Sequence, residues 1–215
     1  ELVQQMLSGT NVALITDAGT PGISDPGEEL VRMAREAGIT VTGLPGACAC
    51  ITALTLSGLP TRRFCFEAFL PTEKNERRAI LEDLKEESRT IILYEAPHHL
   101  KATLAELEDA LGDRRITLCR ELTKKFETVM PMTLSEAVAF YKENEPKGEY
   151  VLVVEGKSLK ARKEEKQKEW QQLSIEEHMA LYEGREMDRK EAMKQVAKDR
   201  GISKREVYDY LIKNC

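Results

Sequence analysis

The chain carries the sequence TDAGTPGISDPG at residues 16–27, directly after the apolar run Val12–Ile15. The apolar run predicts a buried parallel strand, and a helical pattern resumes at residues 28–37. The stretch between them holds three glycines and two prolines, which fix a turn and leave its backbone open at the carboxyl edge of a sheet. Because α/β proteins bind ligands at that edge, the turn predicts a ligand site. The alternative is a rigid connection rich in Asx turns, with no ligand.

A second turn of the same kind follows the next predicted strand, at residues 40–44. Here Pro45 and Gly46 lead into Ala47, Cys48 and a helix of small residues that extends to about residue 57. Small side chains at this junction provide a flat wall for a planar group, and tight packing of helix on sheet is the alternative. Two consecutive strand ends of this kind favour a ligand cleft.

The rest of the chain predicts an α/β fold with a helical extension. We divide it into residues 1–58, residues 59–156 and a charged tail at residues 157–215. The second part has strand patterns at 63–69, 90–94, 115–120, 127–132 and 149–154, with amphipathic helices at 75–87, 98–111 and 134–144. Alternating strands and helices indicate a sheet covered by helices, and the neighbouring 115–120 and 127–132 strands predict a hairpin.

The tail has the pattern of short capped helices. Ser174 and Asp188 each begin a helix, and Gly201 separates two helices in the manner of a helix-turn-helix. Residues 157–215 carry 15 Lys or Arg against 12 Asp or Glu, whereas residues 1–156 carry 17 against 25. The tail is therefore the relatively basic part of an acidic protein, and a solvated helical cap without a partner is the alternative.

Composition indicates a protein of the reduced, cytoplasmic kind. The net charge is -5 and 41% of the residues are hydrophobic, with no run long enough to cross a membrane. The five cysteines form no CxxC pair, and the spacing of Cys48 and Cys50 is unsuited to a zinc site, so we predict no metal.

Several motifs in one order resemble the tetrapyrrole-methylase superfamily and, within it, the branch of ribosomal RNA small subunit methyltransferase I. They are residues 17–27, 44–47, 57–61, 94–100, 120–127 and 147–156. The resemblance implies two α/β domains with the cofactor cleft between them, plus a C-terminal helical extension. It also implies a homodimeric enzyme that transfers a methyl group from S-adenosylmethionine to a cytidine 2′-hydroxyl in 16S rRNA of the small subunit.

One departure from this family concerns the start of the sequence, which opens at Glu1 without a Met. Family members begin with an earlier strand and a Gly-containing loop that help to form the same cleft. We therefore expect that the N-terminal part is missing and that activity of this chain depends on it.

The resemblance and the two turns together predict the residues that bind the cofactor. They are Asp17, Ala18, Gly19, Thr20, Pro21, Gly46, Ala47, Cys48, Tyr94 and Gly148. For Asp17 the alternative is a cap of its own turn.

A ribose 2′-hydroxyl is a poor nucleophile, so a general base or a group that stabilises the developing alkoxide is expected. The candidates at strand ends are Glu95, His98, Glu121 and Lys124. Three of them have a plainer alternative: Glu95 as a charge at a helix N-terminus, His98 as a surface residue, and Lys124 with Lys125 as exposed turn lysines.

The acidic body does not by itself indicate RNA binding, because an RNA surface needs a basic patch. The rRNA substrate therefore rests on the resemblance. The alternatives are a methylase acting on a tetrapyrrole such as a precorrin or uroporphyrinogen, and an inactive truncated scaffold that binds nucleic acid through the tail.

Overall fold

The computed structural model describes residues 1–213, apart from the side chains of Leu159 and Arg162. Its helices are α1 (Leu2–Leu7), α2 (Glu28–Glu36), α3 (Ala49–Leu56), α4 (Lys74–Lys85), α5 (Pro97–Leu111), α6 (Leu134–Glu143), α7 (Leu159–Gln172), α8 (Ile175–Glu183), α9 (Arg189–Arg200) and α10 (Lys204–Lys213). Its strands are β1 (Phe64–Phe69), β2 (Thr90–Glu95), β3 (Arg115–Arg120), β4 (Thr128–Thr133) and β5 (Tyr150–Val154). The chain separates into two compact units, of which the first ends at Gly156 and the second begins at Lys157.

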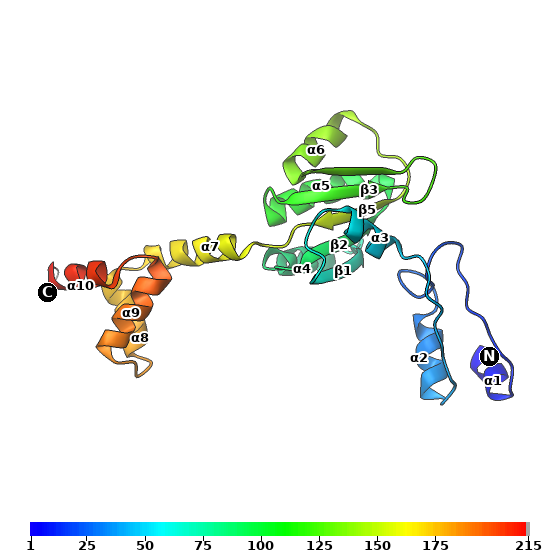
Figure 1. Cartoon of the computed structure of the whole chain (residues 1–215), viewed down its shortest axis with the longest axis horizontal. Coiled ribbons are helices and arrows are strands. Elements are labelled where there is room, and N and C mark those ends of the chain that lie inside the picture. Colours follow the sequence, from blue (N-terminus) through cyan, green and yellow to red (C-terminus); the bar gives the residue numbers. More distant parts are fainter. Residues whose placement is uncertain (214–215) are drawn as a thin grey trace. The chain divides into compact units, whose positions relative to one another are not determined.

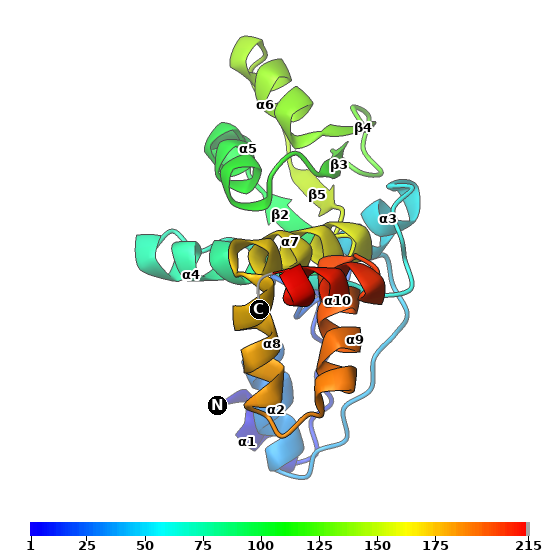
Figure 2. The same cartoon turned by 90° about the vertical axis from the view of Figure 1, so that its left-hand side faces the viewer.

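The first unit contains one sheet, with the strand order β1-β2-β5-β3-β4. β1 and β2 are parallel, whereas β5 is antiparallel to both β2 and β3, and β3 and β4 form the predicted hairpin. The helices α4, α5 and α6 cover one face of the sheet and α3 lies against the other (Figures 1 and 2). The mixed α/β class predicted from the sequence is confirmed.

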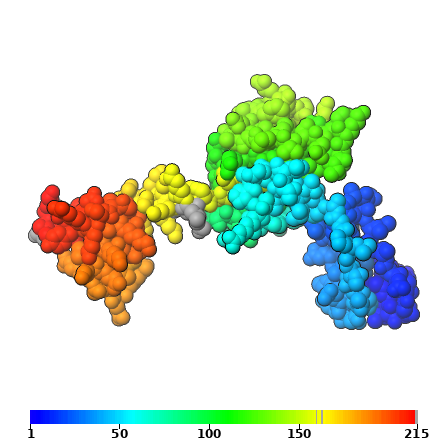
Figure 3. Space-filling view, viewed as in Figure 1, coloured from blue at the N-terminus to red at the C-terminus, as the bar shows by residue number. Residues whose placement is uncertain are grey.

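Two apolar clusters hold these layers together. On the α5 face, leucines of the helices such as Leu104 and Leu107 pack with Leu93, Leu118 and Leu152 of the sheet, and none of these side chains is exposed. On the other face, Ala53 and Leu54 of α3 pack against the sheet. The space-filling view shows the cyan segment that contains α3 against the green sheet (Figure 3). Burial of this apolar surface is the main favourable contribution to folding of the unit.

The predicted strands at residues 12–15 and 40–44 are wrong. Neither segment forms a ladder within the described residues, and Ile15 and Leu44 are 84% and 91% exposed. A strand is stabilised by hydrogen bonds to a neighbouring strand, which an apolar run by itself does not provide. These segments flank α2, which lies beside α1 and apart from the sheet (Figures 1 and 2). The further division at residue 58 stays a prediction.

The second unit is helical, as its sequence predicts. Ser174 begins α8 with a capping box, and the Asp188 carboxylate accepts backbone N–H bonds at the start of α9. Gly201 ends α9 in the left-handed conformation with a φ of 69°. The core of this unit is built from Met179, Val196 and Val207 and their apolar neighbours. No helix within residues 1–213 combines the length and the apolar character that crossing a bilayer requires.

Candidate functional site

The two predicted turns contact each other. The Thr20 hydroxyl donates a hydrogen bond of 3.0 Å to the Ala47 carbonyl, which links residues 27 positions apart. Gly19 approaches the same carbonyl so closely that a Cβ at this position would lie 3.2 Å from its oxygen. The φ of Gly19 is +78°, a conformation that residues with a side chain rarely adopt. The glycine is therefore required both for the turn and for the close approach.

Two aspartates of the first turn have different environments. Asp25 accepts the Thr16 hydroxyl at 3.1 Å and so closes the turn across nine residues. Asp17 is exposed, and within residues 1–213 its carboxylate accepts no hydrogen bond. The alternative in which Asp17 caps its own turn is not formed, which leaves this carboxylate available to a ligand.

The second turn is connected to the end of β2 through Tyr94. The backbone N–H of Cys50, in the first turn of α3, donates to the Tyr94 hydroxyl at 3.2 Å. The Cys48 and Cys50 sulfurs lie 3.3 Å apart, and burial raises the pKa of the Cys50 thiol to about 11. Burial likewise raises the pKa of Tyr94, so its hydroxyl stays protonated near neutral pH. Tyr94 therefore holds the start of α3, directly after residues 45–48, against the sheet.

Glu95, a candidate base, is engaged in a buried network. The residue is 5% exposed, one carboxylate oxygen accepts the Ala96 N–H at 2.8 Å, and the other accepts the Thr103 hydroxyl. Thr103 in turn accepts from Arg77, which forms a 2.6 Å ion pair with Glu106. These contacts join β2 to α5 and α4. They favour a structural role in which Glu95 holds the start of α5. This role is close to the alternative stated above, in which Glu95 is a charge at a helix N-terminus.

His98 has the opposite environment. It is exposed in the first turn of α5, and its ring lies 4.2 Å from that of His99, which is also exposed.

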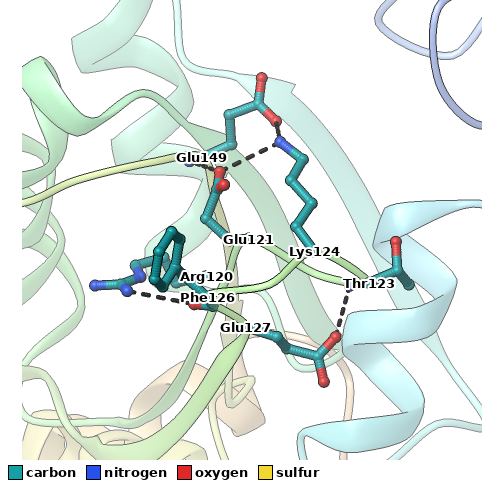
Figure 4. Close-up of polar contacts among 7 residues, drawn as sticks. All are labelled: Arg120, Glu121, Thr123, Lys124, Phe126, Glu127 and Glu149. Carbon is teal, nitrogen blue, oxygen red and sulfur yellow. Dashed lines mark hydrogen bonds and ion pairs between the residues drawn. The ribbon is translucent and has the colours of Figure 1, made fainter.

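Glu121 and Lys124 lie in the loop between β3 and β4, residues 121–127, and both contact Glu149, the residue after Gly148 (Figure 4). The Glu121 carboxylate accepts the Glu149 N–H at 2.9 Å, and the Lys124 ammonium lies 3.3 Å from Glu121 and 2.7 Å from Glu149. Gly148, with a φ of +78°, leaves room for this carboxylate, because a Cβ there would lie 2.5 Å from the Glu121 Cγ. Three predicted residues, Glu121, Lys124 and Gly148, therefore form with Glu149 a set of contacts that we call the loop clamp.

The contacts of this clamp stabilise the charged forms of its members. The Glu149 N–H, followed by Lys124, lowers the pKa of the Glu121 carboxyl. Glu149 and Glu121 raise the pKa of the Lys124 ammonium. Lys124 is therefore a fixed cation and a poor proton acceptor near neutral pH, and Glu121 is a weaker base than an ordinary glutamate.

Sequence reasoning missed several partners of the predicted residues. Glu149 and Thr103 are the clearest, since each supplies a direct contact to a candidate. Thr103 lies on the buried stripe of α5 next to Leu100, Leu104 and Leu107, so a polar residue in that stripe is the signal that predicts a partner for Glu95.

The chain is similar to tetrapyrrole methylases in both sequence and fold. The family model described as Tetrapyrrole (Corrin/Porphyrin) Methylases matches residues 1–138. The fold is similar to that of the methyltransferase CobJ, with a TM-score of 0.55 and 19% identity over 72% of this chain and 68% of that one. It is also similar to the cobalt precorrin-4 methyltransferase CbiF, with a TM-score of 0.50 and 19% identity over 71% and 69% of the two chains.

Curated relatives narrow the class further. A protein of Halalkalibacterium halodurans named Ribosomal RNA small subunit methyltransferase I is 47% identical over 97% of this chain and 71% of its own length. The protein of that name from Bacillus subtilis is 45% identical over the same shares. The chain belongs to the ribosomal RNA small subunit methyltransferase I family of tetrapyrrole methylases.

The loop clamp makes a prediction about backbone protection. In Glu121→Ala the Glu149 N–H loses its acceptor, so we expect its hydrogen exchange to accelerate roughly tenfold, the equivalent of about 1.4 kcal/mol of local opening. Glu121→Gln keeps an oxygen acceptor and is expected to retain most of the protection. Exchange measured residue by residue by NMR checks this. Equal protection of Glu149 in the wild type and in Glu121→Ala would contradict the clamp.

Proposed function

We propose that this chain transfers the methyl group of S-adenosylmethionine to the 2′-hydroxyl of a cytidine in 16S rRNA of the small ribosomal subunit. The names of the relatives support rRNA as the substrate. The observation that carries the proposal is the contact between the two glycine-dependent turns, because it places two stretches of open backbone side by side. The family resemblance further predicts a homodimer in the cytoplasm.

The residues of the two turns fit a cofactor of this kind. Residues 17–19 and 46–47 are exposed, and Gly19 and Gly46 carry no side chain that would keep a ligand from the backbone. Bound S-adenosylmethionine supplies a methyl group already activated on a sulfonium, so the protein has to bind, orient and exclude water. We assign this binding to Asp17, Ala18, Gly19, Thr20, Pro21, Gly46, Ala47 and Cys48, with Tyr94 and Gly148 supporting the walls. Within residues 1–213 there is no cluster of three or more His, Cys, Asp or Glu side chains able to hold a metal.

Among the four catalytic candidates, the contacts favour His98 as the proton acceptor. Its ring is exposed, whereas both oxygens of the Glu95 carboxylate accept hydrogen bonds within the protein. Lys124 is held as a cation by two carboxylates, so it is suited to positioning the loop. We therefore propose positioning roles for Glu95, Glu121 and Lys124, and a proton-transfer role for His98.

The turn contact predicts a change in donor affinity. Thr20→Val removes the hydroxyl that bonds the Ala47 carbonyl, a loss of about 1 kcal/mol, and should weaken S-adenosylmethionine binding roughly fivefold. Thr20→Ser keeps the hydroxyl and should bind like the wild type. Calorimetric titration with the donor measures both. If Thr20→Val binds the donor as tightly as Thr20→Ser, the contact does not support the cofactor.

The substrate is tested by transfer of labelled methyl groups. We expect label in the 16S rRNA of unmethylated small subunits, at the ribose of a cytidine identified by nuclease digestion and mass spectrometry. Uroporphyrinogen III and a precorrin serve as the competing acceptors. Label that appears only in a tetrapyrrole would establish the alternative methylase, and no transfer together with no donor binding would support the inactive scaffold.

The role of His98 is tested against its neighbour. His98→Gln should lower kcat roughly 100-fold, a typical loss for a general base, and should flatten the acid limb of the pH–rate profile. His99→Gln, a change of the same chemistry at the adjacent exposed position, should alter kcat little. The profile is measured as methylation rates between about pH 5.5 and 9, a range that includes the ordinary pKa of an imidazole. Similar profiles for the two variants would remove His98 as the base.

A further inference from the structure

The loop at residues 121–127 has a conformation that is held from several directions. Glu121 and Thr123 have φ values of +50° and +61°, which residues other than glycine adopt only where their surroundings impose them. The Thr123 N–H donates to the Glu127 carboxylate at 2.6 Å, and the Glu121 N–H donates to the Glu149 carbonyl at 2.9 Å. Together with the loop clamp, these bonds hold the loop backbone in one conformation (Figure 4).

At the end of this loop the chain exposes an aromatic ring. Phe126 is 63% exposed, and the Lys125 ammonium lies 5.6 Å from the centre of its ring. The Phe126 carbonyl accepts a 3.3 Å bond from the Arg120 guanidinium, which fixes the backbone that carries the ring. An exposed phenylalanine gives up the free energy that burial would provide. Its place on a constrained loop makes the ring available for a contact with another molecule.

The charges around the ring select the kind of molecule. Lys124 is neutralised by Glu121 and Glu149, whereas Lys125 has no carboxylate partner in the part of the chain that the structure describes. A cation beside an exposed aromatic ring matches a ligand that combines a flat π-system with anionic oxygens.

We propose that the Phe126 ring, with Lys125 beside it, is a stacking platform for a nucleobase of the RNA substrate. The inference rests on the proposed function and names a positioning residue for it. A base stacks on the ring through its π-face, and Lys125 contacts the adjoining phosphate, as in proteins that bind single-stranded RNA. The enzyme requires such a contact because a 2′-hydroxyl is presented for transfer only when its nucleotide is held in one orientation.

The test separates stacking from charge by using two polyanions, poly(C) and heparin, of which only the first carries bases. Phe126→Leu keeps an apolar side chain without a π-face and should weaken poly(C) binding about tenfold while leaving heparin binding unchanged. Lys125→Ala should weaken both. The matched control is Phe64→Leu, since Phe64 is 37% exposed at the opposite end of the sheet, where it pairs with Thr90.

A spectroscopic variant reports the stack directly. The chain has one tryptophan, Trp170, so Phe126→Trp in a Trp170→Phe background gives a single emitter at the loop. Its fluorescence should be quenched by poly(C) and not by heparin, and circular dichroism checks that each variant is folded. The proposal is overturned if poly(C) fails to bind the wild type, if Phe126→Leu binds poly(C) as the wild type does, or if the fluorescence is unchanged at saturation.

These readouts do not depend on catalysis. If the wild type transfers no methyl group to small subunits but poly(C) quenches the loop tryptophan, the stacking platform stands and the proposed reaction fails. If methylation occurs and its KM for subunits is the same for the wild type and Phe126→Leu, the reaction stands and the platform is overturned.

Discussion

The candidate site depends on the position of β5, which runs antiparallel between β2 and β3. The ladder pairs Tyr150 with Glu95 on one side and with Arg120 on the other. Because of this register, the loop after β2, the loop after β3 and the segment before β5 all open at the same edge of the sheet. The loop clamp then joins two of these segments, through the contacts of Glu121 with Glu149. A shift of one residue in this ladder would turn every side chain of β5 to the other face and would separate these groups.

Much of the sheet could be predicted from the sequence, because β2 and β5 contain continuous apolar runs and turn residues bound the strands. The place of β5 could not, since strand order depends on contacts between segments far apart in the chain. The failure at residues 12–15 and 40–44 has the same origin. Their apolar pattern is that of a buried strand, but a pattern specifies only which side chains favour burial, and a ladder also requires a partner with free backbone groups. The turns between these segments were more predictable, because glycine and proline act locally.

The site itself was predicted unevenly, in a way that follows from the range of each interaction. Residues 16–27 and 45–48 do contact each other through the Thr20–Ala47 bond, although the two strands from which this contact was predicted do not form. The hydrogen bonds of each acidic candidate come instead from residues further along the chain. The Glu95 carboxylate accepts from Thr103, and the Glu121 carboxylate accepts from Glu149. One sequence cannot reveal such partners, although a carboxylate next to a helix start already favours a structural role. The plainer alternative for Glu95 was therefore the better guide to its contacts.

The charge of the protein constrains how it can meet an RNA. With a net charge of -5, its long-range field disfavours a polyanion, so recognition has to come from local groups at short range. The clamp uses two carboxylates to hold Lys124, which lowers the positive charge that this lysine presents to solvent. Outward, the same loop presents the exposed ring of Phe126 and the Lys125 ammonium, which has no carboxylate partner among the residues that the structure describes. Stacking is little affected by net charge and by salt, whereas phosphate contacts are strongly affected. An acidic enzyme that acts on RNA is thus expected to rely on stacking at its site more than a basic one does, and a rigid loop is the element that makes such a contact precise.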